Sequence, residues 1–117
     1  NYPFKKEKSD LDIPLPKDTD DRTYLFILKD HLPKLIDTVK PDFIFYLSGV
    51  DVLESDKLGT LSLTLDGCKK RDQYVLDTCR KLKIPVQCSM GGGYSKDIKI
   101  IVEAHANTFR LAQSLYF

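Results

Sequence analysis

Residues 43–47 read Phe-Ile-Phe-Tyr-Leu, a continuous apolar run bounded by Pro41 and Gly49. A short run of this kind is typical of a parallel strand that is buried on both faces of its sheet. Residues 84–89 form a second candidate strand, in which Pro85 lies near the start, where the missing backbone donor is tolerated. The sequence therefore predicts two short strands of a parallel sheet.

Helical patterns flank both predicted strands, so the expected order is helix, strand, helix, strand, helix. The first helix should begin at the acidic cluster of residues 18–21 and end at Lys40, with a kink at Pro33, which lacks a backbone donor. Thr64 should cap the second helix, and the third should begin near Lys96. The expected apolar faces comprise Cys68, Val75, Leu76, Cys79 and Leu82 on the second helix, and Ile98, Ile101, Val102, Phe109 and Ala112 on the third.

Residues 1–17 differ from the rest of the sequence because three of the six prolines lie among them. Proline cannot donate to a strand ladder, so we expect an irregular or extended lead-in here rather than a central strand. The α/β core should occupy residues 18–117, so that the whole chain is one segment of a single domain. Asn1 rather than Met begins the sequence, and we interpret the chain as a processed or excised piece.

Composition excludes several classes of protein. The 117 residues are 42% hydrophobic and 30% charged, which are globular proportions. The 18 basic and 17 acidic side chains are scattered, without the one-signed patch that direct binding of nucleic acid or an anionic membrane requires. No apolar run approaches the ~20 residues of a bilayer-spanning helix, and no basic-then-apolar leader occurs. Cys68, Cys79 and Cys88 form no Cys-x-x-Cys pair, which favours reduced thiols and a location in the cytoplasm, or in the nucleus of a eukaryote.

Two predicted loops carry the polar side chains of greatest interest. Asp51 follows the first strand, and Tyr94 follows Gly91-Gly92-Gly93 after the second. A strand, a crossover helix and a second strand form a right-handed parallel unit, in which neighbouring strands lie about 4.8 Å apart. Ligands of open α/β sheets bind at the carboxyl ends of the strands. If the two strands pair directly, their loops leave side by side, and we then expect the carboxylate of Asp51 and the phenol of Tyr94 to face one crevice.

Each of these features also has a simpler interpretation. Asp51 could cap a loop turn, and Tyr94 could pack on the third helix. The Gly91–Gly93 loop could cradle a phosphate or nucleotide at the N-terminus of that helix, although no Lys-Ser or Lys-Thr pair follows it and no dinucleotide fingerprint occurs. The other polar candidates are assigned ordinary roles: Glu54 and Asp56 in loop capping or solvent, His105 in packing with its hydrogen bonds satisfied, and His31 on a helix surface.

The same two loops carry the strings by which the sequence resembles a known family. Pro41–Asp51 with Asp56–Gly59, followed by Gly91–Tyr94, resembles the histone deacetylase family, and the order and spacing of the two motifs make the resemblance specific. Thr19–Leu25 and Lys70–Asp72 look most like its class IV branch and bacterial relatives. The resemblance implies a parallel, three-layer α/β/α sheet, of which this chain is the C-terminal part.

The resemblance also implies a role for five residues. Asp51 matches the carboxylate that completes a zinc site with an Asp and a His from an earlier loop. Tyr94 matches the phenol that donates a hydrogen bond to the acyl-lysine carbonyl as it becomes an oxyanion, an interaction worth roughly 3–4 kcal/mol for one well-placed donor. Leu58 matches a residue of the acyl-lysine tunnel, and Gly92 and Gly93 match glycines that let the substrate approach the backbone. Zinc with three protein ligands keeps an open position for the water that it activates.

Two elements of the family are absent from the sequence: the adjacent histidines that act as general base, and the Asp-x-His segment that supplies two zinc ligands. We therefore expect the remaining, N-terminal part of the domain as a partner of this chain. The full-length protein should be a zinc-dependent deacylase of acyl-lysine peptides or small acyl amides, whereas this chain alone should be inactive. Two alternatives remain open, a non-catalytic α/β module that binds a phosphate or nucleotide, and an intact pseudo-enzyme or interaction domain.

Overall fold

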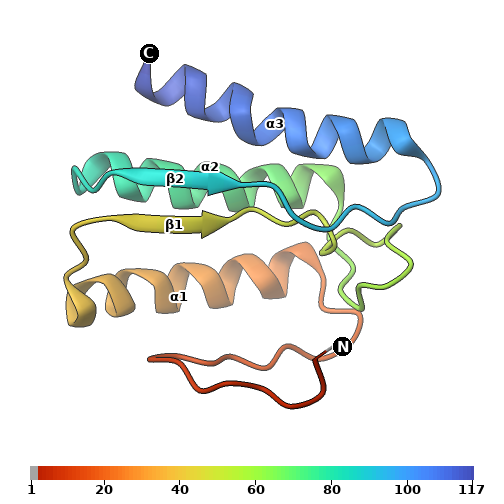
Figure 1. Cartoon of the computed structure of the whole chain (residues 1–117), viewed down its shortest axis with the longest axis horizontal. Coiled ribbons are helices and arrows are strands. Elements are labelled where there is room, and N and C mark those ends of the chain that lie inside the picture. Colours follow the sequence, from red (N-terminus) through yellow and green to blue (C-terminus); the bar gives the residue numbers. More distant parts are fainter. Residues whose placement is uncertain (1–2) are drawn as a thin grey trace.

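The computed structural model describes residues 3–117 and has the element order that the sequence predicts (Figure 1). In this part of the chain, no helix is both long enough and apolar enough to cross a bilayer. The elements, in chain order, are α1 (Asp21–Val39), β1 (Ile44–Leu47), α2 (Leu65–Lys81), β2 (Val86–Ser89) and α3 (Ile98–Tyr116).

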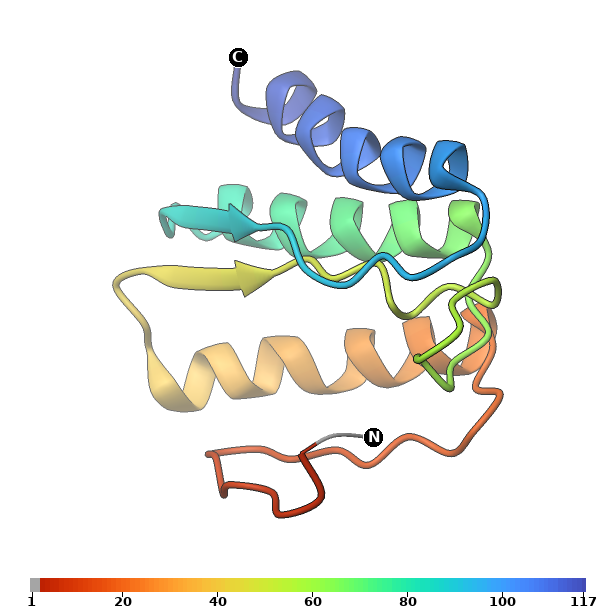
Figure 2. The ribbon, with the colours of Figure 1, turned by 45° about the vertical axis from the view of Figure 1, so that its right-hand side comes forward.

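The two strands pair directly and in parallel, with Ile44 opposite Val86 and Leu47 opposite Ser89. Both strands therefore end at the same edge of the sheet, and the loops that follow them leave side by side (Figures 1 and 2). This confirms the predicted α/β class with a parallel sheet. It also confirms the direct pairing on which the expected meeting of the two loops depends.

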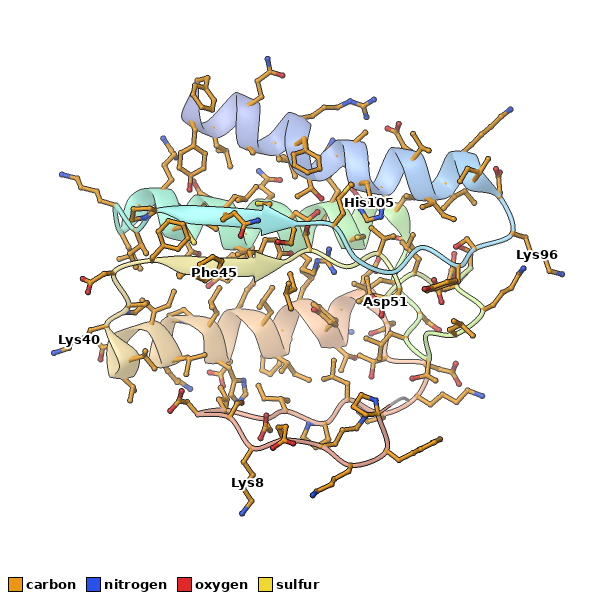
Figure 3. The ribbon with its side chains drawn as sticks, viewed as in Figure 1. Lys8, Lys40, Phe45, Asp51, Lys96 and His105 are labelled. Carbon is orange, nitrogen blue, oxygen red and sulfur yellow. The ribbon has the colours of Figure 1, made fainter. Side chains whose placement is uncertain are left out.

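One expectation for β1 is wrong within the described residues, because only one face of the strand is covered. The Tyr46 side chain points toward α2, whereas Phe45 is 74% and Leu47 is 78% exposed. In Figure 1, α2 lies behind the strands with α1 and α3 on either side of it, and Phe45 lies on the opposite, uncovered side in Figure 3. A strand covered on one side alternates between buried and exposed positions, because successive side chains point to opposite faces.

Helix α1 begins and ends as the sequence suggests. The side chain of Asp20 caps it by accepting a hydrogen bond from the backbone of Thr23, and Lys40 ends it in the left-handed conformation, with φ of 51°. The helix continues through Pro33 as one element. Pro33 leaves the carbonyl of Lys29 without its usual intrahelical donor, and the hydroxyl of Tyr74 on α2 lies 3.5 Å from that oxygen.

The apolar face expected for α2 is largely confirmed. Thr64 caps the helix by accepting from the backbone of Gly67, and the first four residues of the expected face are buried. Leu82 lies just beyond the end of the helix and is exposed. The buried members are Cys68, Val75, Leu76 and Cys79.

The face expected for α3 is wrong in three of its members. Ala104 and Thr108 are the buried positions of this helix, whereas Ile98, Val102 and Phe109 are exposed. Small residues allow α3 to approach α2 closely, and the Thr108 hydroxyl finds a buried acceptor there. Ile100 and Ile101 pack against the buried cluster, whereas Ile98, Val102 and Phe109 remain exposed.

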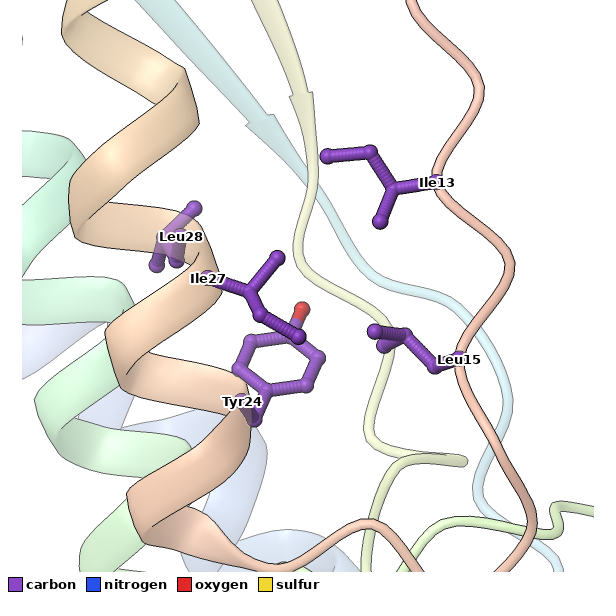
Figure 4. Close-up of a pocket in the computed structure, with 5 residues that line it drawn as sticks. All are labelled: Ile13, Leu15, Tyr24, Ile27 and Leu28. Atoms are coloured by element: carbon purple, nitrogen blue, oxygen red, sulfur yellow. The ribbon is translucent and has the colours of Figure 1, made fainter.

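Residues 3–19 contain no helix or strand and run alongside α1. Ile13 and Leu15 of this segment face Tyr24, Ile27 and Leu28 of α1 across an apolar pocket of about 200 Å³ (Figure 4). Ile13 and Leu15 of this segment therefore lie against a helix rather than in a sheet.

A buried carboxylate on α2 is hydrogen-bonded to both β1 and α3. Oδ1 of Asp72 on α2 accepts hydrogen bonds from the hydroxyl of Tyr46 on β1 (2.5 Å) and from Nε of Arg71 (2.9 Å), and Oδ2 accepts from the hydroxyl of Thr108 on α3 (2.6 Å). Nη2 of Arg71 lies 2.8 Å from Oδ1, close enough for an ion pair but not aligned as a hydrogen bond. Nη1 of Arg71 donates to the carbonyl of Gly49 at 2.7 Å.

This network should carry a large share of the stability. Replacement Asp72→Asn keeps the shape of the side chain but leaves the buried Arg71 guanidinium without its counter-charge. Removal of one partner of a buried ion pair costs about 3–5 kcal/mol, so the free energy of unfolding of the full-length protein should fall by that amount in urea denaturation. The control is Asp77→Asn on the same helix, which removes exposed ion pairs to Arg80 and Lys81 and should change the stability little. Equal effects of the two substitutions would contradict the account.

Candidate functional site

The two loops at the carboxyl end of the sheet continue the parallel pairing beyond the strands. The backbone N–H of Ser48 donates to the carbonyl of Ser89 at 3.0 Å, and that of Val50 donates to the carbonyl of Gly91 at 3.0 Å. The first loop is therefore held in register with the glycine turn up to the residue before Asp51. Figure 3 shows Asp51 beyond the ends of both strands.

Glycines make room for Asp51. Gly92 has φ of +65°, and a Cβ placed on it would lie 2.7 Å from Cβ of Asp51. A Cβ on Gly49 would lie 2.7 Å from Oδ1 of Asp51. The Asp51 side chain thus fits between two backbones that only glycine allows to come so close.

Asp51 and Gly92 line one open pocket of about 320 Å³ at this edge of the sheet. The buried guanidinium of Arg71 reaches the same pocket from below. The lining residues are Tyr24, Leu47, Gly49, Asp51, Val52, Arg71, Met90, Gly91 and Gly92.

Tyr94 and Leu58 lie outside that lining, and their side chains are 56% and 63% exposed. What the structure brings together is therefore the Asp51 loop and the glycine turn from which Tyr94 projects. The role of the Tyr94 hydroxyl and that of the Leu58 side chain stay predictions.

Gly93 packs the turn onto α3. It has φ of +106°, and a Cβ placed on it would lie 2.8 Å from Ile101 and 3.7 Å from Nε2 of His105. His105 thus packs as the sequence suggests, but its hydrogen bonds are not all satisfied, because its buried Nδ1 has no partner among the described residues. Burial lowers the pKa of His105, with Asp72 and Arg71 acting in opposite directions. The imidazole is accordingly a neutral packing group beneath the turn.

Asp56 has more contacts than the loop capping or solvent exposure that the sequence led us to expect. Its carboxylate accepts from the backbone N–H groups of Leu58 and Gly59 in its own loop, which is the expected loop capping, and also from that of Tyr94. The first two contacts are readable from sequence, since an Asp commonly accepts from residues two or three positions further on. The third joins residues 38 positions apart and has no local signal.

The described residues do not form a metal site by themselves, since in residues 3–117 no three His, Cys, Asp or Glu side chains are arranged so that they could hold a metal ion. A catalytic zinc needs three protein ligands, of which the exposed carboxylate of Asp51 could be one. Burial raises the pKa of the Cys68 thiol to about 11, and it also raises the pKa values of Cys79 and Cys88. Cys68 and Cys79 are buried and pack in the core.

The geometry disfavours a phosphate in the Gly91–Gly93 turn. The N–H of Tyr94 already donates to Asp56, and the side chain of Asp97 caps the start of α3. The carboxylate of Asp51 lies against Gly92. Three acidic groups around one turn oppose the binding of an anion.

A model of the histone deacetylase domain matches residues 3–109 of the chain. The chain belongs to the histone deacetylase family. An uncharacterized protein of Picosynechococcus is 45% identical over 116 residues, and histone deacetylase 2 of Arabidopsis thaliana is 29% identical over 113 residues. They match 99% and 93% of this chain.

The solved structure of the HDA15 HD domain resembles 84% of the chain, with a TM-score of 0.68 and 20% sequence identity, which shows that the fold is shared. The chain spans only 39% and 29% of the lengths of the two relatives and 27% of the solved chain. The predicted family and its α/β fold are thus confirmed for a segment of a histone deacetylase domain.

Two neighbouring glycines offer a matched test of this geometry. Gly92→Ala forces a left-handed residue and a contact with Asp51, so it should lower the free energy of unfolding of the full-length protein by about 1–3 kcal/mol. In Gly91→Ala the new Cβ would lie 3.7 Å from its nearest neighbour, and φ lies outside the left-handed region, so stability should be unchanged or slightly higher. Urea denaturation measures both, and a Gly91 variant as unstable as the Gly92 variant would contradict this description.

Proposed function

We propose that this chain is the C-terminal segment of a zinc-dependent deacylase that hydrolyses the acyl amide of acyl-lysine or of a related small amide. The observation that carries the proposal is the packing of Asp51 against Gly92, across two loops at the carboxyl edge of the sheet. Both loops carry the sequence motifs that resemble the histone deacetylase family. The model of the histone deacetylase domain matches residues 3–109 and so includes both loops.

Asp51 would supply one carboxylate ligand to the zinc, and the other two ligands would come from the part of the domain that precedes this segment. When bound, zinc activates a water molecule and polarises the acyl carbonyl. The exposed position of Asp51 supports this assignment, since a ligand must remain open to the metal.

Tyr94 would act as a neutral hydrogen-bond donor to the acyl carbonyl oxygen. A phenol suits this role because it donates without ionising, and a fixed donor stabilises the negative charge that develops in the transition state. Leu58 would form an apolar wall for the acyl-lysine side chain. Gly92 and Gly93 would let the acyl-lysine side chain approach the backbone.

The uncovered face of the sheet supports the proposal that the rest of the domain packs here. Phe43, Phe45 and Leu47 are exposed on or beside β1, although parallel sheets are normally covered on both faces. Exposed apolar clusters of this kind mark contact surfaces. The preceding part of the domain would supply the third layer of the sheet, the adjacent histidines and the Asp-x-His segment.

The role of Tyr94 predicts a loss of turnover in the Tyr94→Phe variant of the full-length protein. Removal of one oxyanion donor costs about 10²- to 10³-fold in kcat, so deacylation of an acetyl-lysine peptide should fall by that factor with little change in zinc content. Tyr74→Phe is the control, because the Tyr74 hydroxyl lies 3.5 Å from the Lys29 carbonyl, on the helical side of the molecule. Unchanged turnover in Tyr94→Phe would count heavily against the proposal.

Residues 1–117 expressed alone should show no deacylation when zinc is added, because Asp51 is only one of the three ligands that a catalytic zinc requires. The same assay on the full-length protein, with and without a zinc chelator, provides the comparison. Chelator-sensitive activity is expected only from the full-length protein. Activity of the isolated segment would overturn the division of the site between two parts of the domain.

A further inference from the structure

A single carboxylate connects the two loops of the site. Oδ1 of Asp56 accepts from the backbone N–H groups of Leu58 at 2.8 Å and Gly59 at 2.7 Å, and Oδ2 accepts from that of Tyr94 at 2.9 Å. Asp56 is therefore bound to the main chain of both residues whose side chains are proposed to contact the substrate.

The Tyr94 turn depends on this contact because its own sequence gives it little rigidity. Three glycines precede Tyr94, and α3 does not begin until Ile98. On one side the turn is held by the bond from the N–H of Val50 to the carbonyl of Gly91. On the other side it is held by Asp56 and by the bond between the hydroxyls of Ser55 and Ser95 at 2.7 Å. The main chain of Asp56 also pairs with that of Ser95 as an isolated bridge.

The other end of the same carboxylate fixes the Leu58–Gly59 turn against Asp51. A Cβ on Gly59 would lie 1.8 Å from the carbonyl oxygen of Asp51, so the backbone of Gly59 packs directly on that of the proposed ligand. One side chain thus holds three parts of the site in a fixed relation: the Asp51 backbone, the Leu58 turn and the Tyr94 turn.

The ionised form of Asp56 is the one that suits these contacts. Burial alone would raise its pKa, but the N–H groups of Gly59, Tyr94 and Leu58 outweigh burial, and the pKa of this carboxyl lies below its usual value. A carboxylate offers only acceptors to the three N–H groups. An asparagine in its place would turn an NH₂ group toward at least one of them.

We propose that Asp56 is a positioning residue for Tyr94, whose carboxylate fixes the Tyr94 main chain against the Leu58–Gly59 turn and so places the phenol relative to the substrate carbonyl. The inference rests on the proposed function, because it assigns Asp56 a task in that same reaction. Asp56 itself touches neither substrate nor metal. Its effect passes through the position of Tyr94.

The test is a double-mutant cycle in the full-length, zinc-loaded protein with an acetyl-lysine peptide as substrate. Asp56→Asn should lower kcat about 10- to 100-fold, since small misplacements of a catalytic group have effects of this order, and should change KM less than about threefold. On the Tyr94→Phe background the same substitution should lower kcat less than about threefold, because the group that it positions is already gone. Zinc content should be unchanged throughout.

Glu54→Gln is the matched control, because Glu54 is an exposed acidic residue of the same loop. It should leave kcat and KM as in the wild type. If Asp56→Asn does not fold, Asp56→Glu keeps the charge, moves the carboxylate by one methylene, and enters the same cycle. An equal fold-loss in kcat on both backgrounds, or no loss on either, would overturn the inference, since a residue that only supports the fold would act regardless of the Tyr94 hydroxyl.

Hydrogen exchange separates this inference from the proposed function. The Tyr94 amide should exchange at least about tenfold faster in Asp56→Asn than in the wild type or in Glu54→Gln, because its acceptor is lost. This readout does not require activity. A wild-type protein with no deacylase activity would refute the proposed function, and with it the catalytic task of Asp56. An unaltered exchange rate of the Tyr94 amide in Asp56→Asn would refute only the positioning role of Asp56, whatever the activity.

Discussion

The buried carboxylate of Asp72 is the contact on which the arrangement of the whole segment depends. It accepts from Tyr46 on β1, from Arg71 on its own helix and from Thr108 on α3, so one side chain fixes the strand and two helices together. Burial raises the pKa of the Tyr46 phenol well above its usual range, so this hydroxyl remains a donor. A buried network in which both oxygens of one carboxylate are engaged favours one packing, because each alternative leaves a charge or further donors unpaired.

The same network reaches the candidate site through Arg71. Its guanidinium donates to the carbonyl of Gly49, two residues before Asp51, at the point where β1 gives way to its loop. From there the backbone of Asp51 lies against Gly92 on one side and Gly59 on the other. Asp51, the proposed metal ligand, is therefore held by close backbone packing next to the buried network. The Tyr94 turn follows three glycines and depends on contacts with the loop that carries Asp56.

The sequence was sufficient for the features that local chemistry determines. Short apolar runs predicted two strands, and helical spacing predicted the three helices. The expectation that the Asp51 loop and the glycine turn are neighbours depended on direct pairing of the two strands, and the structure shows that pairing. What the sequence did not reveal depends on partners distant along the chain. Three features are of this kind: the bond from Tyr94 to Asp56, the burial of Thr108 on α3, and the lack of a partner for Nδ1 of His105 within residues 3–117. The sequence also did not reveal that only one face of β1 is covered. An apolar run indicates that a strand has apolar side chains on both faces, but it does not indicate which part of the chain covers each face.

In the proposed reaction, Asp51 and Tyr94 would act on one metal-bound substrate from two adjacent loops. The decisive experiment is a crystal structure of the full-length protein grown with zinc, with anomalous diffraction collected at the zinc absorption edge. We expect a zinc ion about 2.0–2.2 Å from a carboxylate oxygen of Asp51, with the Tyr94 hydroxyl turned toward the open side of that ion. A zinc bound elsewhere, or a Tyr94 hydroxyl on the far side of the turn from Asp51, would contradict it.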